Sequence, residues 1–212
     1  MKDIFLSWIQ WSGKWKQADL LMEKFLGKFK YFETWSVLRA LAWTDNAIWN
    51  YLKETIETWW LVKDEVVVAI FNVFLQTVEP SDVLLLDWVL RKMWQTQAIC
   101  KEMQKVGREF VVLHFDLQDD IAYERLASRI VCWKCGNNSY GWNIGWICEN
   151  CGWELVRRSD DLNIQSVKTR MASFHKETEP CVKWLEENGW LVHIDANRWV
   201  DEIFQDVLKY VK

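Results

Sequence analysis

The stretch SWIQWSGKWKQ, residues 7–17, stands between a short apolar run and a segment of helical period. It places Gly13 and Lys14 at a predicted strand-to-helix junction, the context that a phosphate-binding GxxxxGK[ST] loop requires. Aligned on that pattern, Trp8 takes the first glycine position and Trp15 the Ser/Thr position. Such a loop needs glycine because its backbone adopts left-handed angles and its N–H groups close on the phosphates. The stretch alone fits an ordinary turn as well, so other parts of the chain must decide.

Short apolar runs alternate along the chain with longer segments of helical period. This alternation predicts an α/β protein with a parallel sheet covered by helices. The predicted strands are residues 3–7, 82–87, 110–116 and 190–195. The predicted helices are residues 13–25, 63–78, 94–106, 119–130, 161–188 and 201–211. Segments 33–62, mostly helical, and 132–156, rich in Cys, Gly and Asn, fall outside the alternation and indicate two insertions into one core.

The composition restricts the function classes. The 212 residues are 50% hydrophobic, enough for a sizeable core. A net charge of -4 argues against a general nucleic-acid binder, which needs excess Lys and Arg to neutralise phosphates. The first residues do not resemble a signal peptide, and no apolar run reaches the roughly 18 residues of a membrane span. We therefore expect a cytoplasmic protein with small-molecule partners and no nucleic-acid or membrane partner. We also expect it to be a monomer.

Two CxxC pairs, CWKC and CENC, predict a metal site. Cys132, Cys135, Cys148 and Cys151 could place four thiolates around one ion, the arrangement typical of structural zinc. An iron–sulfur cluster or a redox pair is the alternative, although nothing nearby indicates electron transfer. Cys100 and Cys181 lie on predicted helical faces and are expected to be buried small hydrophobes. We expect the three histidines, His114, His175 and His193, to be isolated structural residues.

Taken together, spaced motifs along almost the whole chain resemble those of the adenylate kinase family, in its long form with a zinc-binding lid. The phosphate loop GxxGxGKGTQ corresponds to WIQWSGKWKQ, with Gly13, Lys14 and Gln17 in place and Lys16 where Thr is usual. The motifs TGxxxR, GxLVxDExV and DGFPRxxxQ correspond to residues 34–39, 59–67 and 87–95. RxxxR corresponds to residues 125–129, RxDD to residues 158–161 and RxxxxHxxTxP to residues 170–180. Leu90 stands where the family usually has Pro, and Ile130 replaces an Arg often found there.

The resemblance implies the P-loop nucleoside monophosphate kinase fold, a parallel sheet flanked by helices with two inserted subdomains. Residues 1–32, 63–124 and 162–212 would form the core. Residues 33–62 would form the nucleoside monophosphate-binding insertion, and residues 125–161 a lid carrying the zinc site. Both insertions would close over the substrates, and their opening to release product would limit turnover.

The implied reaction is reversible phosphoryl transfer, ATP + AMP = 2 ADP, with Mg2+ accompanying ATP and structural Zn2+ in the lid. The implied catalytic residues carry charge that stabilises the transferred group: Lys14, Asp87, Arg91, Arg129, Arg158 and Arg170. The residues implied to bind ATP are Trp11, Ser12, Gly13, Lys14, Trp15, Lys16, Arg125, Arg129, Ser139, Tyr140 and Arg198. The residues implied to bind AMP are Thr34, Arg39, Trp60, Leu61, Val62, Trp88, Arg91, Gln95, Arg158 and Arg170. In a protein with the family glycines restored, Lys14→Met is expected to abolish transfer with little loss of fold.

Tryptophan repeatedly stands where the family has glycine. The chain has 17 Trp and 8 Gly, so glycine is about 4% of the residues against a usual 7% or so. Eight tryptophans occupy family glycine positions: Trp8, Trp11, Trp15, Trp35, Trp49, Trp59, Trp88 and Trp153. Our hypothesis is that UGA codons, which some bacteria decode as glycine, were translated as tryptophan, whereas Trp184 is a genuine Trp. UGG codons at residues 8, 11, 15, 35 and 88 would exclude it.

Two other functions remain open from the sequence. The chain could be another nucleoside monophosphate kinase, acting on UMP or CMP or using GTP. With every tryptophan taken literally, it could instead be a non-catalytic zinc-ribbon or nucleotide-binding protein, because three indoles would fill the phosphate site.

Overall fold

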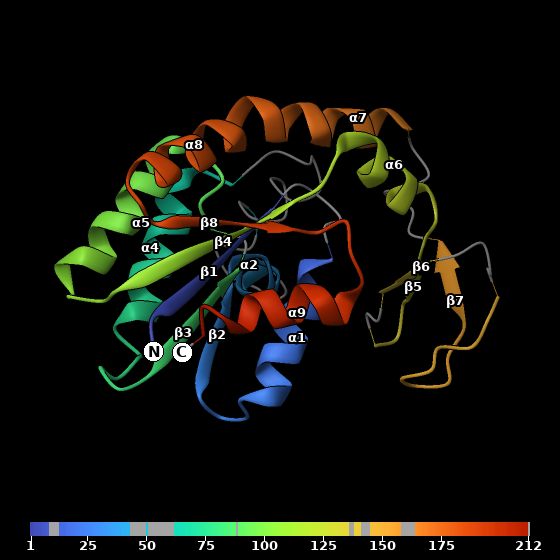
Figure 1. The fold of residues 1–212 in the computed structure, drawn as a ribbon, viewed down its shortest axis with the longest axis horizontal. Coiled ribbons are helices and arrows are strands. Elements are labelled where there is room, and N and C mark those ends of the chain that lie inside the picture. Colours follow the sequence, from blue (N-terminus) through green and yellow to red (C-terminus); the bar gives the residue numbers. More distant parts are fainter. Residues whose placement is uncertain are drawn as a thin grey trace.

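The computed structural model describes residues 1–8, 13–42, 50, 62–87, 89–135, 138–140, 145–157 and 164–211. A parallel sheet of five strands in the order β2-β3-β1-β4-β8 forms its centre (Figure 1). The strands are β1 (Asp3–Trp8), β2 (Phe29–Glu33), β3 (Val83–Asp87), β4 (Phe110–Asp116) and β8 (Leu191–Asp195). The predicted parallel sheet flanked by helices is confirmed, and the four predicted strands correspond to β1, β3, β4 and β8.

Strand β2 is an element that the sequence did not predict. It pairs in parallel with β3, from Phe29 opposite Val83 to Glu33 opposite Asp87. In its residues FKYFE the first, fourth and fifth positions are buried and the second and third are exposed, so no alternation marks the strand. The predicted insertion at residue 33 therefore begins where β2 ends.

Helices cover both faces of the sheet, as alternating strand side chains require. On one face, Ile4 and Leu113 pack with Leu21 and Phe204 in a buried cluster. The helices on this face are α1 (Lys14–Lys24) and α9 (Val200–Leu208). On the other face, Phe5 packs with residues of three helices, α4 (Asp64–Leu75), α5 (Met93–Lys105) and α8 (Glu179–Glu187). The buried positions of Cys100 and Cys181 in α5 and α8 agree with the prediction that they are core residues.

A second, smaller sheet stands apart from the first at one end of the molecule (Figure 1). It is antiparallel, in the order β6-β5-β7, and comprises β5 (Arg129–Cys132), β6 (Asn138–Tyr140) and β7 (Leu155–Arg157). Helix α6 (Asp119–Ala127) leads into it and α7 (Ile164–Ser173) follows it. Helix α6 ends three residues before the predicted boundary because Arg129 and Ile130 already belong to β5.

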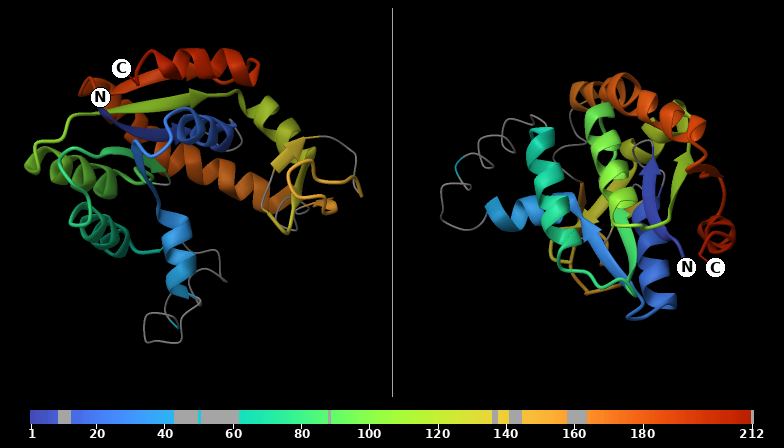
Figure 2. Two further views of the ribbon diagram at one scale, coloured as in Figure 1. Left: turned by 90° about the horizontal axis from the view of Figure 1, so that it is seen from below. Right: turned by 90° about the vertical axis from the view of Figure 1, so that its left-hand side faces the viewer.

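The long helix predicted over residues 161–188 is interrupted. Residues 161–163 lie outside the described residues, and α7 and α8 are joined by the π-helix η2 (Phe174–Thr178). Helix α2 (Thr34–Ala42) projects away from the sheet on another side of the molecule (Figure 2). Within the described residues, no helix is long and apolar enough to cross a membrane.

Candidate nucleotide-binding site

Gly13 and the first turn of α1 have the backbone geometry of an anion site. Gly13 is the N-cap of α1 with φ 80° and ψ 12°, a left-handed conformation that glycine adopts without steric cost. As glycine, the N-cap residue has no side chain to cap the helix, and the first turn of α1 holds no acidic residue. The first N–H groups of α1 and the positive end of its dipole can therefore receive an anion. Residues 9–12, including the predicted ligands Trp11 and Ser12, lie outside the described residues.

Lys14 and Asp87 form a buried ion pair beside the N-terminus of α1. Lys14 Nζ donates to Asp87 Oδ1 over 2.6 Å, and the side chains are 5% and 0% exposed. Burial lowers the pKa of Lys14 to about 7, although the neighbouring Asp87 opposes the change. Asp87 ends β3, and the parallel pairing of β1 with β3 brings these two residues together across 73 positions of sequence. The sequence assigns a role to each residue but does not predict their contact.

Two residues of β2 that the sequence did not single out belong to the same cluster. Tyr31 Oη donates to Asp87 Oδ2 over 3.2 Å. Glu33 lies directly opposite Asp87 in the strand register, is 8% exposed and favours the charged form of Lys14. Ser36 at the start of α2 donates its hydroxyl to Glu33 Oε2. Had β2 been recognised, its last residues would have been placed at the carboxyl edge of the sheet, where ligands of parallel sheets bind.

Arg91 lies on the loop between β3 and α5, near Lys14 and Asp87. Burial lowers the pKa of Arg91 to about 10, while Asp87 favours its charge. Its backbone N–H donates to Gln95 Oε1 over 2.9 Å, and its carbonyl accepts from Thr178 Oγ1 over 3.0 Å. Gln95, predicted to contact the AMP base, is 5% exposed and holds this loop with its carbonyl oxygen.

The other residues predicted to bind AMP, the phosphoryl acceptor, are only partly described in the structure. Thr34, 3% exposed, begins α2, and Val62, 6% exposed, packs in a small cluster with Leu38 and Val67. Arg39 lies on α2, but its side chain is outside the description. The remaining predicted ligands that lie outside the described residues are Trp60, Leu61, Trp88 and Arg158.

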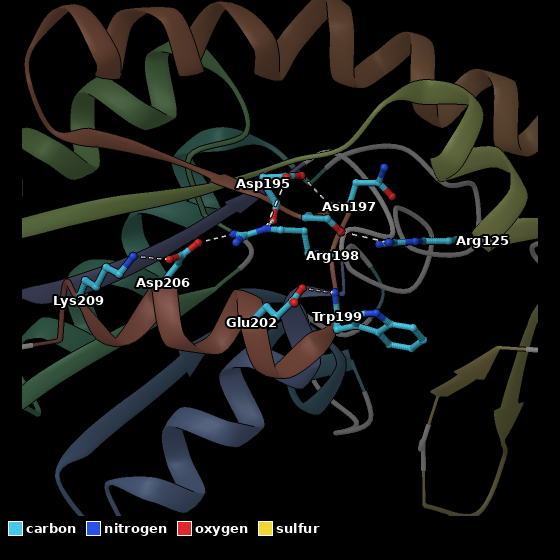
Figure 3. Close-up of polar contacts among 9 residues, drawn as sticks. Arg125, Asp195, Asn197, Arg198, Trp199, Glu202, Asp206 and Lys209 are labelled. Atoms are coloured by element: carbon cyan, nitrogen blue, oxygen red, sulfur yellow. Dashed lines mark hydrogen bonds and ion pairs between the residues drawn. The ribbon is translucent and has the colours of Figure 1, made fainter.

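Several residues predicted to bind ATP, the phosphoryl donor, lie around the turn that follows β8. Polar contacts join this turn to α6 and α9 (Figure 3). Arg125, on the last turn of α6, donates Nη2 to the Ala196 carbonyl over 3.0 Å. Gln17 of α1 donates Nε2 to the Val200 carbonyl over 3.0 Å. Arg198 pairs with Asp206 of α9 and with Asp195, at 3.4 Å from Nε to Oδ2. Arg198 thus holds the turn against α9, and its predicted role toward ATP stays a prediction.

The remaining residues predicted on the ATP side, together with Arg170, lie on α1, in the small sheet and on α7. Trp15 is 40% exposed in the first turn of α1, where the Lys14 ammonium lies 5.7 Å from its ring centre, and Lys16 is exposed beside it. In the small sheet, Arg129 begins β5 and pairs with Tyr140 of β6, while Ser139 pairs with Ile130. Arg170 lies in the last turn of α7.

The prediction that the histidines are isolated is wrong. His175 contacts Glu179 Oε2 through Nδ1 and Asp119 Oδ2 through Nε2, both at 2.9 Å, and these carboxylates raise its pKa. His114 and His193 lie opposite each other on β4 and β8 with ring centres 5.7 Å apart. Burial, together with His193, lowers the pKa of His114 to about 3, so its imidazole is neutral at ordinary pH. Each histidine has a partner that is remote in sequence, and sequence spacing cannot reveal such partners.

The four predicted cysteine ligands come together in the small sheet and its hairpin. The sulfur atoms of Cys132, Cys135, Cys148 and Cys151 all lie within 4.8 Å of one another. Two of the distances are 3.4 Å, from Cys132 to Cys151, and 3.6 Å, from Cys135 to Cys148. A tetrahedral zinc site with Zn–S bonds of about 2.3 Å places its sulfurs roughly 3.8 Å apart. This geometry could hold a metal ion.

Comparison with known proteins agrees with this geometry over most of the chain. Residues 10–190 match the family profile described as adenylate kinase. An adenylate kinase of Bacillus licheniformis is 29% identical over 204 residues, which cover 92% of this chain and 91% of the relative. One from Caldanaerobacter subterraneus is 28% identical over 93% of this chain and 90% of the relative. One from Methanosarcina barkeri is 27% identical over 95% of this chain and 94% of the relative.

Proposed function

The chain belongs to the adenylate kinase family, and from this premise we propose that it transfers the γ-phosphoryl group of ATP to AMP and releases two ADP. It is a phosphotransferase of the nucleoside monophosphate kinase class. The buried Lys14–Asp87 pair carries the proposal, because it places a cation and a carboxylate together beside the N-terminus of α1. This is where the phosphates of a bound nucleotide meet the helix dipole.

In the proposed reaction the bond between the γ-phosphorus and the β–γ bridging oxygen breaks, and an AMP phosphate oxygen forms a new bond to that phosphorus. Such transfer needs charge neutralisation and in-line positioning more than covalent help. Lys14 neutralises charge on the donor phosphates, and Arg91, which lies close enough to Asp87 for its charge to be favoured, holds the acceptor phosphate. Arg39, Arg129, Arg158 and Arg170 are proposed to contribute further positive charge when the insertions close.

Closure itself is part of the proposal. Residues 33–62 are proposed to fold over AMP and residues 125–161 over ATP, which excludes water from the transferred group. The position of the small sheet, apart from the main sheet and reached through α6 and α7, supports a lid that moves as one body (Figure 1).

Mg2+ bound with ATP would be held on the protein side by Asp87, with Glu33 adjacent to it. Buried carboxylates at the ends of neighbouring strands are suitable, since Mg2+ prefers oxygen ligands and keeps several of its waters. The cation would supply neutralisation of the β- and γ-phosphate charge.

We further propose that the cysteine cluster holds structural Zn2+. Sulfur–sulfur distances of 3.4 and 3.6 Å support tetrahedral thiolate ligation and exceed the roughly 2.05 Å of a disulfide bond. The metal would stiffen the lid. Reduced, metal-binding thiols also support the expectation of a cytoplasmic enzyme, which we propose is a monomer.

The hypothesis that several tryptophans are glycines in the native protein is also retained as a proposal. Among the eight positions, Trp15 and Trp153 are each 40% exposed, so glycine at these two positions would leave no fully buried space unfilled. The codons of the source gene decide the matter, and the intact mass of the protein from its native organism provides an independent check.

The function is tested with a coupled assay that offers AMP, UMP, CMP and GMP as acceptors and ATP or GTP as donors. The assay uses the chain as printed and a version with glycine at the eight positions. We expect both proteins to fold and the glycine version to phosphorylate AMP with ATP. A preference for another acceptor or for GTP would reassign the substrate. ATP binding without transfer to any acceptor would refute catalysis in favour of a nucleotide-binding role.

A further inference from the structure

The loop that carries Arg91 has a strained backbone. Leu90 has φ 63°, and in the described part of the chain it is the one non-glycine residue with a positive φ. Left-handed geometry is unfavourable for an L-residue with a large side chain, so it persists only where the surroundings impose it. Leu90 is 2% exposed and packs in the core between the sheet and α5. The strain therefore lies next to a residue proposed to bind the acceptor phosphate.

Two side chains hold the backbone immediately after Leu90. Gln95, on the first turn of α5, accepts the Arg91 N–H over 2.9 Å, and this contact is local in sequence. Thr178 donates its hydroxyl to the Arg91 carbonyl over 3.0 Å, and it comes from 87 residues further along the chain. Thr178 is 5% exposed, so the bond is protected from competition by water. Arg91 is thus held on both sides of its Cα atom.

Thr178 reaches this carbonyl from an irregular turn. It is the last residue of the π-helix η2, and the next residue, Glu179, donates its N–H to the Phe174 carbonyl five positions back. Pro180 follows at the start of α8 and lacks the N–H that a regular helix would use there. One extra residue in a helical turn rotates all later residues of the helix by about 100°, so the π-turn decides which face Thr178 presents. π-turns within helices are frequently found at functional sites.

We infer that Thr178 is a positioning residue for the acceptor phosphate site: its hydroxyl holds the Arg91 carbonyl, keeps Leu90 left-handed and so orients the Arg91 side chain. The inference rests on the proposed function, in which Arg91 binds the AMP phosphate. Thr178 itself touches the backbone of Arg91 and acts only through that residue.

The inference predicts that loss of the Thr178 hydroxyl affects the binding of AMP and of ATP differently. Without the hydroxyl, Leu90 can relax to a negative φ, and a backbone change of this size redirects the side chain of the next residue. AMP binding should weaken because it depends on Arg91, whereas ATP binding depends on Lys14 and the N-terminus of α1. A purely structural role for Thr178 would instead lower the stability of the protein without distinguishing AMP from ATP.

The test takes as its parent the version with glycine at the eight positions, for which AMP-dependent transfer is expected. It compares Thr178→Val, which keeps the shape of the side chain and removes the hydroxyl, with Thr178→Ser, which keeps the hydroxyl. Thr77→Val is the matched control, because Thr77 donates to the Phe74 carbonyl over 2.7 Å at an exposed turn. We measure KM for AMP at saturating ATP, KM for ATP at saturating AMP, and the urea midpoint of unfolding. Thr178→Val should raise KM for AMP about 5- to 30-fold, the factor that 1–2 kcal/mol represents. It should leave KM for ATP within about twofold of the parent.

Thr178→Ser should restore KM for AMP to within about threefold of the parent, and Thr77→Val should change neither constant. Equal effects of Thr178→Val on the two substrates, or a lowered urea midpoint with an unchanged KM for AMP, would overturn the positioning role. A parent protein that shows no AMP-dependent transfer and binds no AMP in calorimetry would instead refute the proposed function. The two failures are therefore distinguishable.

Discussion

Replacing Lys14 with methionine removes one half of a buried ion pair and leaves Asp87, with 0% of its side chain exposed, without that counter-charge. At 2.6 Å, two unit charges attract by roughly 6 kcal/mol at an effective dielectric constant of about 20. The cost of taking both charges out of water is of similar size, so the intact pair contributes little net stability. Breaking the pair has a large effect, because the cost of burying Asp87 then has no compensating attraction.

We expect Lys14→Met to lower the free energy of unfolding by about 3–5 kcal/mol at pH 6, below the Lys14 pKa of about 7, where the amine is charged. For a chain of this size the melting temperature should fall by roughly 6–20 °C. Asp87→Asn should cost less at the same pH, because burial lowers the pKa of Lys14 and chiefly Asp87 opposes that change, so without the carboxylate the amine can lose its proton. The double variant Lys14→Met/Asp87→Asn should recover most of the loss, and all three variants should lack phosphoryl transfer.

The assay is urea unfolding followed by circular dichroism, with the four proteins of the cycle compared at one pH. The exposed pair Lys105–Glu102, also at 2.6 Å, provides the control cycle and should show a coupling of at most about 1 kcal/mol. If the two single effects simply add in the double variant to within about 0.5 kcal/mol, the buried-pair argument is wrong.

Three further outcomes are expected. Asp3→Asn should lower the free energy of unfolding by about 2–3 kcal/mol and leave kcat unchanged, because Asp3 Oδ2 binds Arg108 Nε at 2.6 Å at the opposite, amino edge of the sheet; a changed kcat would contradict this. Removal of metal by a chelator should lower the melting temperature, and elemental analysis of the untreated protein should find one zinc per chain; a metal-free protein with the same melting temperature would exclude a structural metal. Because Asp119 and Glu179 raise the pKa of His175 in the folded state, its stabilisation is present below the unfolded value of about 6.5 and is lost as pH rises through the folded pKa. His175→Asn should therefore lower the urea midpoint at pH 6 but not at pH 9, and an equal loss at both values would refute the assignment.

Elements with a clear hydrophobic pattern, either a period or a continuous apolar run, were predicted well. Strand β4, residues 110–116, matches its prediction at both ends, since a continuous apolar run is typical of a strand buried on both faces. Strand β2 and the π-turn at residues 174–178 were not predicted. A short strand such as β2, in which buried and exposed residues do not alternate, has no hydrophobic period to detect. The π-turn depends both on Pro180, which follows it, and on tertiary contacts that no local sequence pattern encodes.

In the candidate site, too, the sequence identified single residues, whereas the structure showed their contacts. Motif spacing identified Lys14, Asp87 and Arg91 one by one, but it made Lys14 a phosphate ligand whose loss would cost little stability. The structure shows that Lys14 is also half of a buried ion pair, and its role as a phosphate ligand stays a prediction. Arg198, predicted to bind ATP, forms an ion pair with Asp206 of α9.

By itself the sequence determined the parallel α/β architecture, the cluster of four cysteines and the identities of the charged residues. These follow from hydrophobic periodicity and from the spacing of motif residues, patterns that extend over only a few residues of sequence. Only the tertiary structure decided which charges are buried together, that Glu33 and Tyr31 join them, and that Thr178 holds the loop of Arg91. Strand order and helix packing make contacts between residues 73 or 87 positions apart, and no local pattern encodes such contacts.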